Sequence, residues 1–137
     1  MSGVVESRIP ELTARARAAQ SRAYAPYSKF PVGAALLATD GTIIEGCNVE
    51  NASYPAGTCA ERVALGAAVA AGHRAFTAVV ITSDAQGATP PCGICRQALA
   101  EFGTSLHVIA VTRDGRETRW TLEALLPHPF TPSSLHT

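Results

Sequence analysis

The chain has 137 residues, of which 47% are hydrophobic and 16% are charged, and this composition predicts one compact domain over residues 1–137. Eleven basic and eleven acidic residues leave a formal net charge of zero, so the sequence lacks the basic excess of nucleic-acid-binding proteins. Its apolar runs are too short to span a bilayer, and it does not open on a basic segment followed by an apolar stretch. We therefore expect no membrane partner, no secretory signal and a cytoplasmic protein.

Hydrophobic periodicity and turn residues divide the chain into nine predicted elements. Apolar residues at helical spacing predict helices, and short apolar runs between turn residues predict strands. Asp40-Gly41 predicts a tight hairpin turn, and Thr58 is a predicted N-cap. Together the elements predict an α/β fold in three layers, with a mixed five-stranded sheet and helices on both faces. In chain order they are a helix at 10–23, strands at 32–38 and 42–47, a helix at 59–71, a strand at 76–82, a helix at 92–102, strands at 106–112 and 116–120, and a short helix at 122–126, before an irregular tail.

Three cysteines at two predicted helix starts indicate a metal site. Cys59-Ala60-Glu61-Arg62 is followed about thirty residues later by Pro91-Cys92-Gly93-Ile94-Cys95-Arg96. A catalytic zinc uses three protein ligands so that water can take the fourth position. Helix starts also favour thiolates, because unpaired N–H groups and the positive end of the helix dipole lie there. The spacing therefore predicts one Zn²⁺ per chain, held by Cys59, Cys92 and Cys95.

Three charged residues adjoin the predicted ligands. Glu61 as a fourth ligand would close the zinc to water, so we interpret it as the general acid and base, a role that typically contributes about 10²- to 10⁴-fold. Three thiolates around a dication leave a net negative charge, which the guanidinium groups of Arg62 and Arg96 would offset by donating to the sulfurs. The alternatives are a first-turn glutamate stabilised by the helix dipole and two exposed arginines near helix starts.

The fourth cysteine, Cys47, separates several classes of protein. As a fourth ligand it would make the zinc site structural, as in a non-catalytic binding module. It has no Cys-x-x-Cys partner, so we interpret it as a buried structural thiol. Two disulfides in a secreted protein and a redox pair at Cys92 and Cys95 are further alternatives. The missing export signal and the neighbouring Glu61 favour metal binding over both.

Other motifs extend over nearly the whole chain. They are Tyr24-Ala25-Pro26-Tyr27-Ser28-Lys29-Phe30, Val32-Gly33-Ala34-Ala35-Leu36, Gly46-Cys47-Asn48-Val49-Glu50-Asn51, Pro91-Cys92-Gly93-Ile94-Cys95-Arg96-Gln97 and Leu125-Leu126-Pro127. With the Cys59 motif, their order and spacing resemble those of the small homotetrameric cytidine deaminases. The resemblance implies the cytidine deaminase-like fold, a homotetramer with shared active sites, and hydrolysis of cytidine and 2'-deoxycytidine to the uridine forms with release of ammonia in pyrimidine salvage.

The resemblance also implies roles for single residues around a nucleoside substrate. Asn48 and Glu50 would hydrogen-bond the ribose hydroxyls, and residues two apart on an extended segment share one face. Phe30 would pack against the base. Tyr54 and Phe130 would complete the pocket of a neighbouring subunit. Ala60 is the remaining substrate contact that the resemblance implies.

Several alternatives stay open beside these roles. The aromatic residues could belong to the core, and Asn48 could be a turn former. Ile94 stands where the family usually has a small residue, and His128-Pro129 replaces the usual small or polar pair before Phe130. A deaminase for another aminated base or nucleoside is the nearest rival function, and Asn48 with Glu50 favours a ribose-bearing substrate.

Overall fold

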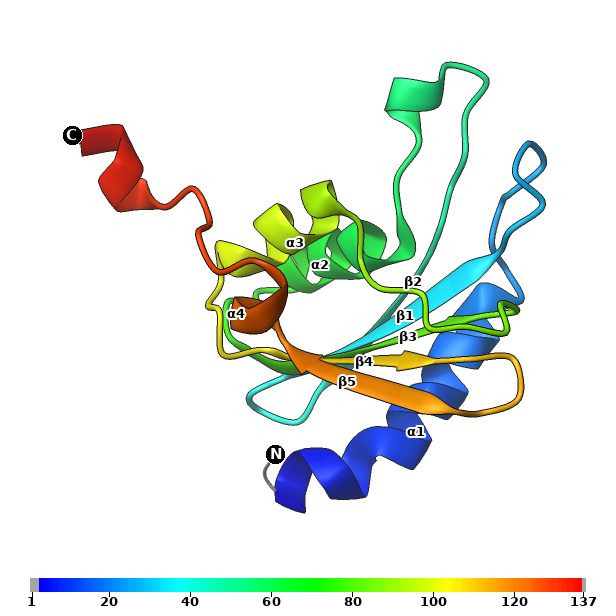
Figure 1. Cartoon of the computed structure of the whole chain (residues 1–137), viewed down its shortest axis with the longest axis horizontal. Helices are drawn as coiled ribbons and strands as arrows, with labels where there is room; N and C mark the ends of the chain where they lie inside the picture. The colour runs from blue at the N-terminus through cyan, green and yellow to red at the C-terminus, as the bar shows by residue number, and fades with distance from the viewer. Residues whose placement is uncertain (1–2, 137) are drawn as a thin grey trace.

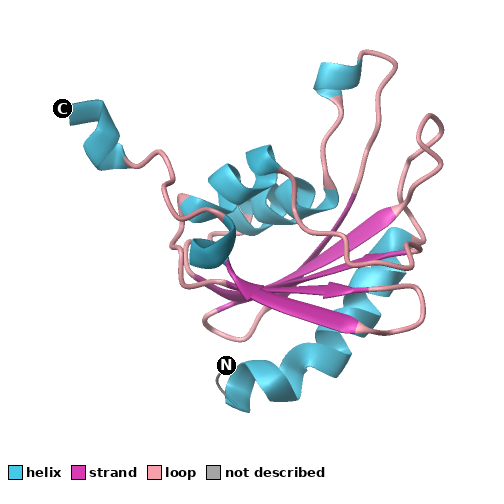
Figure 2. Cartoon of the chain, viewed as in Figure 1, coloured by secondary structure: helices cyan, strands magenta, loops and turns pink. Residues whose placement is uncertain are grey.

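The computed structural model describes residues 3–136 and arranges them in three layers around one sheet (Figure 1). The strand order is β2-β1-β3-β4-β5. Only β3 and β4 pair in parallel, so the sheet is mixed, as predicted. α1 lies on one face, and α2 and α3 lie on the other (Figures 1 and 2). The bounds are α1 Gly3–Gln20, β1 Val32–Ala38, β2 Ile43–Cys47, η1 Tyr54–Ala56, α2 Ala60–Ala70, β3 Phe76–Ser83, α3 Gly93–Ala100, β4 His107–Val111, β5 Glu117–Thr121, α4 Leu122–Leu125 and η2 Pro132–His136.

The hydrophobic core has two halves, one on each face of the sheet. Successive side chains of a strand point to opposite faces. Ala35, Leu37 and Val80 accordingly pack against α1, whereas Leu36 and Val79 pack on the side of α2 and α3. The central strands are therefore buried on both faces, which explains why they consist of continuous apolar runs.

Two glycines bring a helix close to the sheet on each face. A Cβ at Gly33 would lie 1.9 Å from the carbonyl oxygen of Ala16 in α1. A Cβ at Gly46 would lie 2.4 Å from the amide nitrogen of Ala64 and 2.5 Å from the carbonyl oxygen of Ala60. Because Gly46 has no side chain, α2 can lie directly against β2. The first residues of α2 therefore lie near the segment that follows β2.

The first helix is longer than the sequence predicted. It begins at Gly3 rather than at Pro10, and Val5 and Ile9 extend its buried stripe. A proline usually marks the first turn of a helix, but Pro10 lies inside this one, where it removes one backbone hydrogen bond. Figure 1 shows α1 bending along its length, as an internal proline favours. None of the helices within residues 3–136 is long and apolar enough to cross a membrane.

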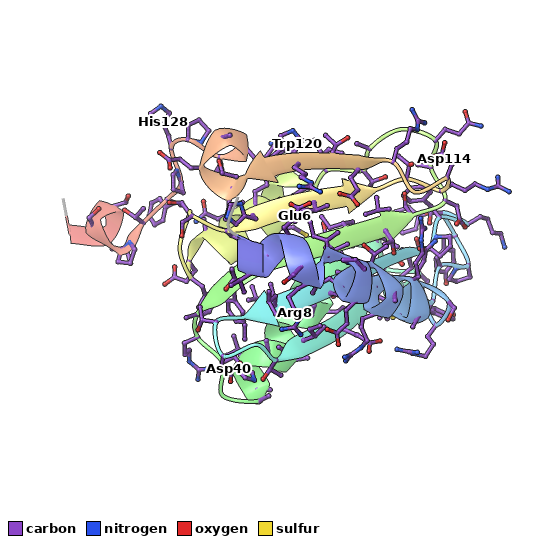
Figure 3. All side chains as sticks on the ribbon, turned by 90° about the horizontal axis from the view of Figure 1, so that it is seen from below. Glu6, Arg8, Asp40, Asp114, Trp120 and His128 are labelled. Atoms are coloured by element: carbon purple, nitrogen blue, oxygen red, sulfur yellow. The ribbon has the colours of Figure 1, made fainter. Side chains whose placement is uncertain are left out.

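Charged side chains of α1 attach this helix to the sheet. Arg15 of α1 pairs with Glu45 of β2, and so does Arg22, two residues after the end of the helix. Arg17 donates to backbone carbonyls at the ends of β3 and β4. Glu6, labelled in Figure 3 on the α1 side of the sheet, pairs at 2.6 Å with an arginine of β5. These groups therefore hold α1 to four of the five strands and do more than solvate its outer face.

The start of α2 and the C-terminal tail also differ from the prediction. Cys59 is the N-cap of α2. Thr58, the predicted N-cap, instead forms an isolated bridge with Val49. The tail, predicted to be irregular, contains the short 3-10 helix η2. The N-cap differs because Thr58 is held by backbone pairing from the preceding loop, which a local capping signal does not reveal.

Candidate metal centre and substrate cleft

Two helix starts bring the three predicted zinc ligands together. Cys59 and Cys92 are the N-caps of α2 and α3, and Cys95 lies in the first turn of α3. The Sγ atoms of Cys59 and Cys92 are 3.8 Å apart, those of Cys92 and Cys95 are 3.5 Å apart, and all three lie within 4.8 Å of one another. A tetrahedral zinc with Zn–S bonds of about 2.3 Å requires sulfurs about 3.8 Å apart. The three thiols therefore fit a zinc ion, and the exposed Cys92 leaves the group open on one side.

The fourth cysteine lies outside this group. Cys47 is the last residue of β2, is half-buried and pairs across the sheet with Gly33. The metal-ligating group contains only the other three cysteines among the residues that the structure describes. All four thiols are free. The geometry therefore does not support two alternatives that the sequence left open, which are a zinc site closed by four sulfurs and a pair of disulfides.

Cys59 and Cys95 share a hydrogen bond that shifts the pKa values of the two thiols in opposite directions. The pKa of Cys59 is lowered to about 5, chiefly by its hydrogen bond with Cys95 and further by Arg62. The pKa of Cys95 is raised, chiefly by the same bond and by burial. Nη2 of Arg62 lies 3.9 Å from Sγ of Cys59, while its buried Nε has no hydrogen-bond partner. Arg62 thus faces the sulfurs, as expected of a group that offsets thiolate charge.

Arg96 has a different environment. Its guanidinium donates to the carbonyl oxygens of Pro91 and Leu125, each at 2.9 Å. These bonds tie the loop before α3 to the end of α4. The prediction that Arg96 donates to the sulfurs is therefore wrong. Its contacts instead fix the residue that immediately precedes Cys92.

Glu61 is buried in the first turn of α2, with 5% of its surface exposed. Burial raises its pKa from the ordinary 4.5 to about 7, and the nearby charge of Cys59 acts in the same direction. A carboxyl with such a pKa can both accept and release a proton near neutral pH. The position and the titration of Glu61 therefore suit a proton carrier.

The two expected sugar contacts lie directly after β2 and bind a neighbouring turn. Oδ1 of Asn48 accepts a backbone N–H of β1 at 2.9 Å, and its Nδ2 donates to the carbonyl oxygen of Phe30 at 3.0 Å. Glu50 accepts the backbone N–H groups of Tyr27 and Ser28 at 3.0 and 3.1 Å, and also the hydroxyl of Ser28. Ser28 was not predicted as a site residue, although its place between Tyr27 and Phe30 in the family motif was a signal.

A cleft of about 360 Å³ connects two of the three clustered cysteines to these polar residues. Asn48, Glu50, Cys59 and Cys92 line it together with Tyr54 and Ile94. An adjoining hollow of about 390 Å³ shares Glu50 and Tyr54 and extends to Tyr27 and Ser28. The structure thus joins thiol, carboxylate and amide groups in one concave surface, as a small-molecule site requires.

Among the other expected substrate contacts, Tyr54 lines the cleft, whereas Phe30, Phe130 and Ala60 are not among its lining residues. Tyr54 is 77% exposed on η1, at the tip of a projecting loop, and its ring meets that of Tyr27 edge to face with centroids 6.2 Å apart (Figure 2). Phe130 is 60% exposed and is not among the lining residues, while both its backbone groups bond to Gln97 of α3. Ala60 is fully buried in the core, so it presents no surface to the cleft.

Comparisons with known proteins agree with this geometry. A family model described as the cytidine and deoxycytidylate deaminase zinc-binding region matches residues 7–111. The cytidine deaminase of Sporosarcina psychrophila is 46% identical over 128 residues, which cover 93% of this chain and 94% of that protein. The cytidine deaminase of Mycobacterium tuberculosis H37Rv is 37% identical over 124 residues, which cover 90% and 80%.

A solved structure has the same fold at similar identity. The crystal structure of cytidine deaminase from Burkholderia pseudomallei superposes with a TM-score of 0.86 at 45% identity, over 89% of this chain and 98% of that one. The sequence match extends over most of the chain, and the fold and the cysteine group agree with it. The chain therefore belongs to the cytidine and deoxycytidylate deaminase family, whose members share a zinc-binding region.

Proposed function

We propose that the chain is a zinc-dependent enzyme that hydrolyses cytidine and 2'-deoxycytidine to uridine and 2'-deoxyuridine and releases ammonia. The main support is the group of three sulfurs within 4.8 Å of one another, two of which line the cleft, together with the buried Glu61, whose pKa is raised to about 7 and which lies two residues after Cys59. The relatives named above, which are cytidine deaminases, support the choice of substrate. Because substrate and product are free nucleosides, we assign the reaction to cytoplasmic pyrimidine salvage.

Cys59, Cys92 and Cys95 would hold the zinc. When bound, zinc would supply a Lewis acid that lowers the pKa of a water. Glu61 would take a proton from this water and pass it to ring nitrogen 3 as the oxygen adds to carbon 4 of the base. Glu61 would then take the second proton of the water from the hydroxyl on carbon 4 and deliver it to the amino group as the bond from carbon 4 to nitrogen breaks. One water is consumed and one ammonia leaves for each nucleoside.

The remaining residues of the cleft would bind and orient the nucleoside. Asn48 and Glu50 offer an amide donor and a carboxylate acceptor for sugar hydroxyls. Phe30 would pack against the base from the turn that these two residues hold. Arg62 would neutralise part of the thiolate charge from its position 3.9 Å from Cys59. Arg96 would act indirectly, because its hydrogen bond to Pro91 holds the residue that precedes the ligand Cys92.

We also propose that residues 1–137 form one catalytic domain and that four copies associate with shared active sites. A single sheet and its two core halves support the single domain. Tyr54 lies on η1, in a loop that projects from the body (Figure 2), and Phe130 lies in the segment between α4 and η2; their side chains are 77% and 60% exposed. Large apolar side chains exposed in this way favour burial against another surface. Each would then reach the cleft of a neighbouring copy.

A panel of substrates tests the proposed activity. The purified protein should convert cytidine and 2'-deoxycytidine, as followed by ultraviolet absorbance and by ammonia release, and a chelator should stop both. Free cytosine should react far more slowly because it offers no hydroxyl to Asn48 and Glu50. Adenosine and a cytosine-containing single-stranded DNA are controls for other deaminase classes. The proposal fails if neither cytidine nor 2'-deoxycytidine is converted, or if cytosine is converted equally well.

A further inference from the structure

The turn before β1 contains a backbone conformation that the proposed chemistry does not explain. Lys29 has φ of 59°, and it is the one non-glycine residue with positive φ among those that the structure describes. This left-handed conformation is unfavourable for a residue with a Cβ, so it persists only where surrounding contacts hold it. Two of those contacts are an N–H of Lys29 bonded to the carbonyl of Ala25 at 3.1 Å and the hydroxyl of Ser28, described next.

The hydroxyl of Ser28 connects the backbone of Phe30 to the carboxylate of Glu50. Its oxygen accepts the N–H of Phe30 at 3.0 Å, and its proton is donated to Oε2 of Glu50. A serine hydroxyl has one proton to donate, and an ionised carboxylate can only accept. The direction of this chain is therefore fixed, from the Phe30 amide through Ser28 to Glu50. The same hydrogen bond is the main reason that the pKa of Glu50 is lowered, which keeps the carboxylate ionised.

The carboxylate of Glu50 is held in one orientation by these contacts. It accepts three hydrogen bonds, two at Oε1 from backbone N–H groups and one at Oε2 from Ser28. A carboxylate has about four acceptor positions, so about one remains for a ligand. The remaining position lies on a carboxylate that lines both the cleft and the adjoining hollow. A ligand hydroxyl can thus bind without first ordering the side chain.

Phe30 is held from both sides by the residues expected to bind the sugar. Its N–H reaches Glu50 through Ser28, and its carbonyl accepts Nδ2 of Asn48 at 3.0 Å. A change in the Glu50 carboxylate would therefore be transmitted to the backbone that carries the aromatic ring. The left-handed Lys29 lies between Ser28 and Phe30 and lets the hydroxyl meet the amide two residues later.

We infer that Ser28 is a positioning residue that couples two parts of ligand recognition: the acceptor for a sugar hydroxyl at Glu50 and the backbone that presents Phe30 to the base. The inference rests on the proposed function, because it assumes a nucleoside with a sugar hydroxyl as ligand. Ser28 itself need not touch the substrate. Its effect should be largest when Glu50 is a carboxylate and the substrate offers a hydroxyl.

Kinetics of Ser28→Ala test this coupling. The loss of a hydrogen bond to a charged group should lower kcat/KM for cytidine about tenfold or more, mainly through KM. With 2',3'-dideoxycytidine the same variant should lose much less of its kcat/KM, because no sugar hydroxyl is available at those positions and only the effect on the Phe30 backbone remains. Ser28→Thr, which keeps the hydroxyl, should restore most of the loss. In a Glu50→Gln background, Ser28→Ala should have little further effect.

Ser21→Ala is the matched control, because the hydroxyl of Ser21 bonds only locally, to Ala18 at the end of α1. A titration of Glu50 by carbon NMR gives a second readout without substrate: Ser28→Ala should raise the pKa of Glu50, and Ser21→Ala should leave it unchanged. If the wild type fails to deaminate cytidine, the proposed function is wrong while the titration still decides the Ser28–Glu50 contact. Equal losses on both substrates, additive effects with Glu50→Gln, or an unchanged Glu50 titration would overturn the inference.

Discussion

Replacing Glu61 by glutamine removes the proton-transfer function of this residue while keeping its side-chain volume. Glutamine keeps the volume and a polar end but cannot exchange a proton at pH 7. Since Glu61 is proposed to carry two proton transfers, kcat should fall by about 10³-fold or more, near the upper end of what general acid–base groups contribute. Cytidine absorbance measures this loss, and zinc content should stay at the wild-type value. A kcat within about tenfold of the wild type would refute the proton-carrier role.

Glu61→Gln should also make the metal-free protein more stable than the wild type at pH 8. Burial raises the pKa of Glu61 from 4.5 to about 7, which corresponds to about 3 kcal/mol at 1.36 kcal/mol per pH unit. The folded state holds the proton more tightly, so the wild type loses this stability as the pH rises from 4.5 to about 7. Glu61→Gln should lack that loss. Urea unfolding of chelator-treated protein at pH 5 and pH 8 measures it, and equal stability of the two proteins at pH 8 would contradict the burial argument.

Five further substitutions test the metal group, the packing of α2 on the sheet and the pairing of Glu45 with α1. Cys92→Ser should lower bound zinc and activity together, whereas Cys47→Ser should leave both unchanged; zinc lost from the Cys47 variant would revive the four-sulfur site. Gly46→Ala should destabilise the fold by several kcal/mol, because its Cβ would lie 2.4 Å from a backbone atom of α2. A Cβ at Gly66 meets nothing within 4 Å, so Gly66→Ala should stabilise the helix by about 0.5 to 1 kcal/mol. Similar melting temperatures for these two variants would contradict this packing. The pKa of Glu45 is lowered chiefly by an arginine of α1, so its contribution is complete above pH 4.5 and disappears as the pH falls through the lowered value. Glu45→Gln should therefore be less stable than the wild type at pH 7 and similar to it at low pH, and a constant difference in unfolding free energy across this range would exclude the pairing.

Local sequence signals predicted most of the fold and the metal group. The central strands consist of continuous apolar runs, and the cysteines mark two helix starts, so both features are visible in the local sequence. The start of α1 was wrong because Pro10 resembles a first-turn proline, whereas the buried Val5 and Ile9 sustain the helix before it. Tertiary packing overrode a local start signal there.

Contacts between distant residues explain the other differences. Arg96 adjoins Cys95 in sequence, but its donors reach Pro91 and Leu125, the second of these 29 residues away. Ser28 lies 22 residues before Glu50, and nothing local indicates that its hydroxyl meets that carboxylate. Such partners become known only when the fold brings the two segments together.

Activity as a function of bound zinc tests the central claim most directly. Metal-free protein would be reloaded with increasing zinc, and the initial rate of cytidine deamination would be plotted against zinc bound per chain. We predict a rate that rises linearly and stops rising at one zinc per chain, with one ammonia released for each uridine formed. Full activity in the metal-free protein, or one bound zinc without deamination of cytidine, would contradict the proposed function.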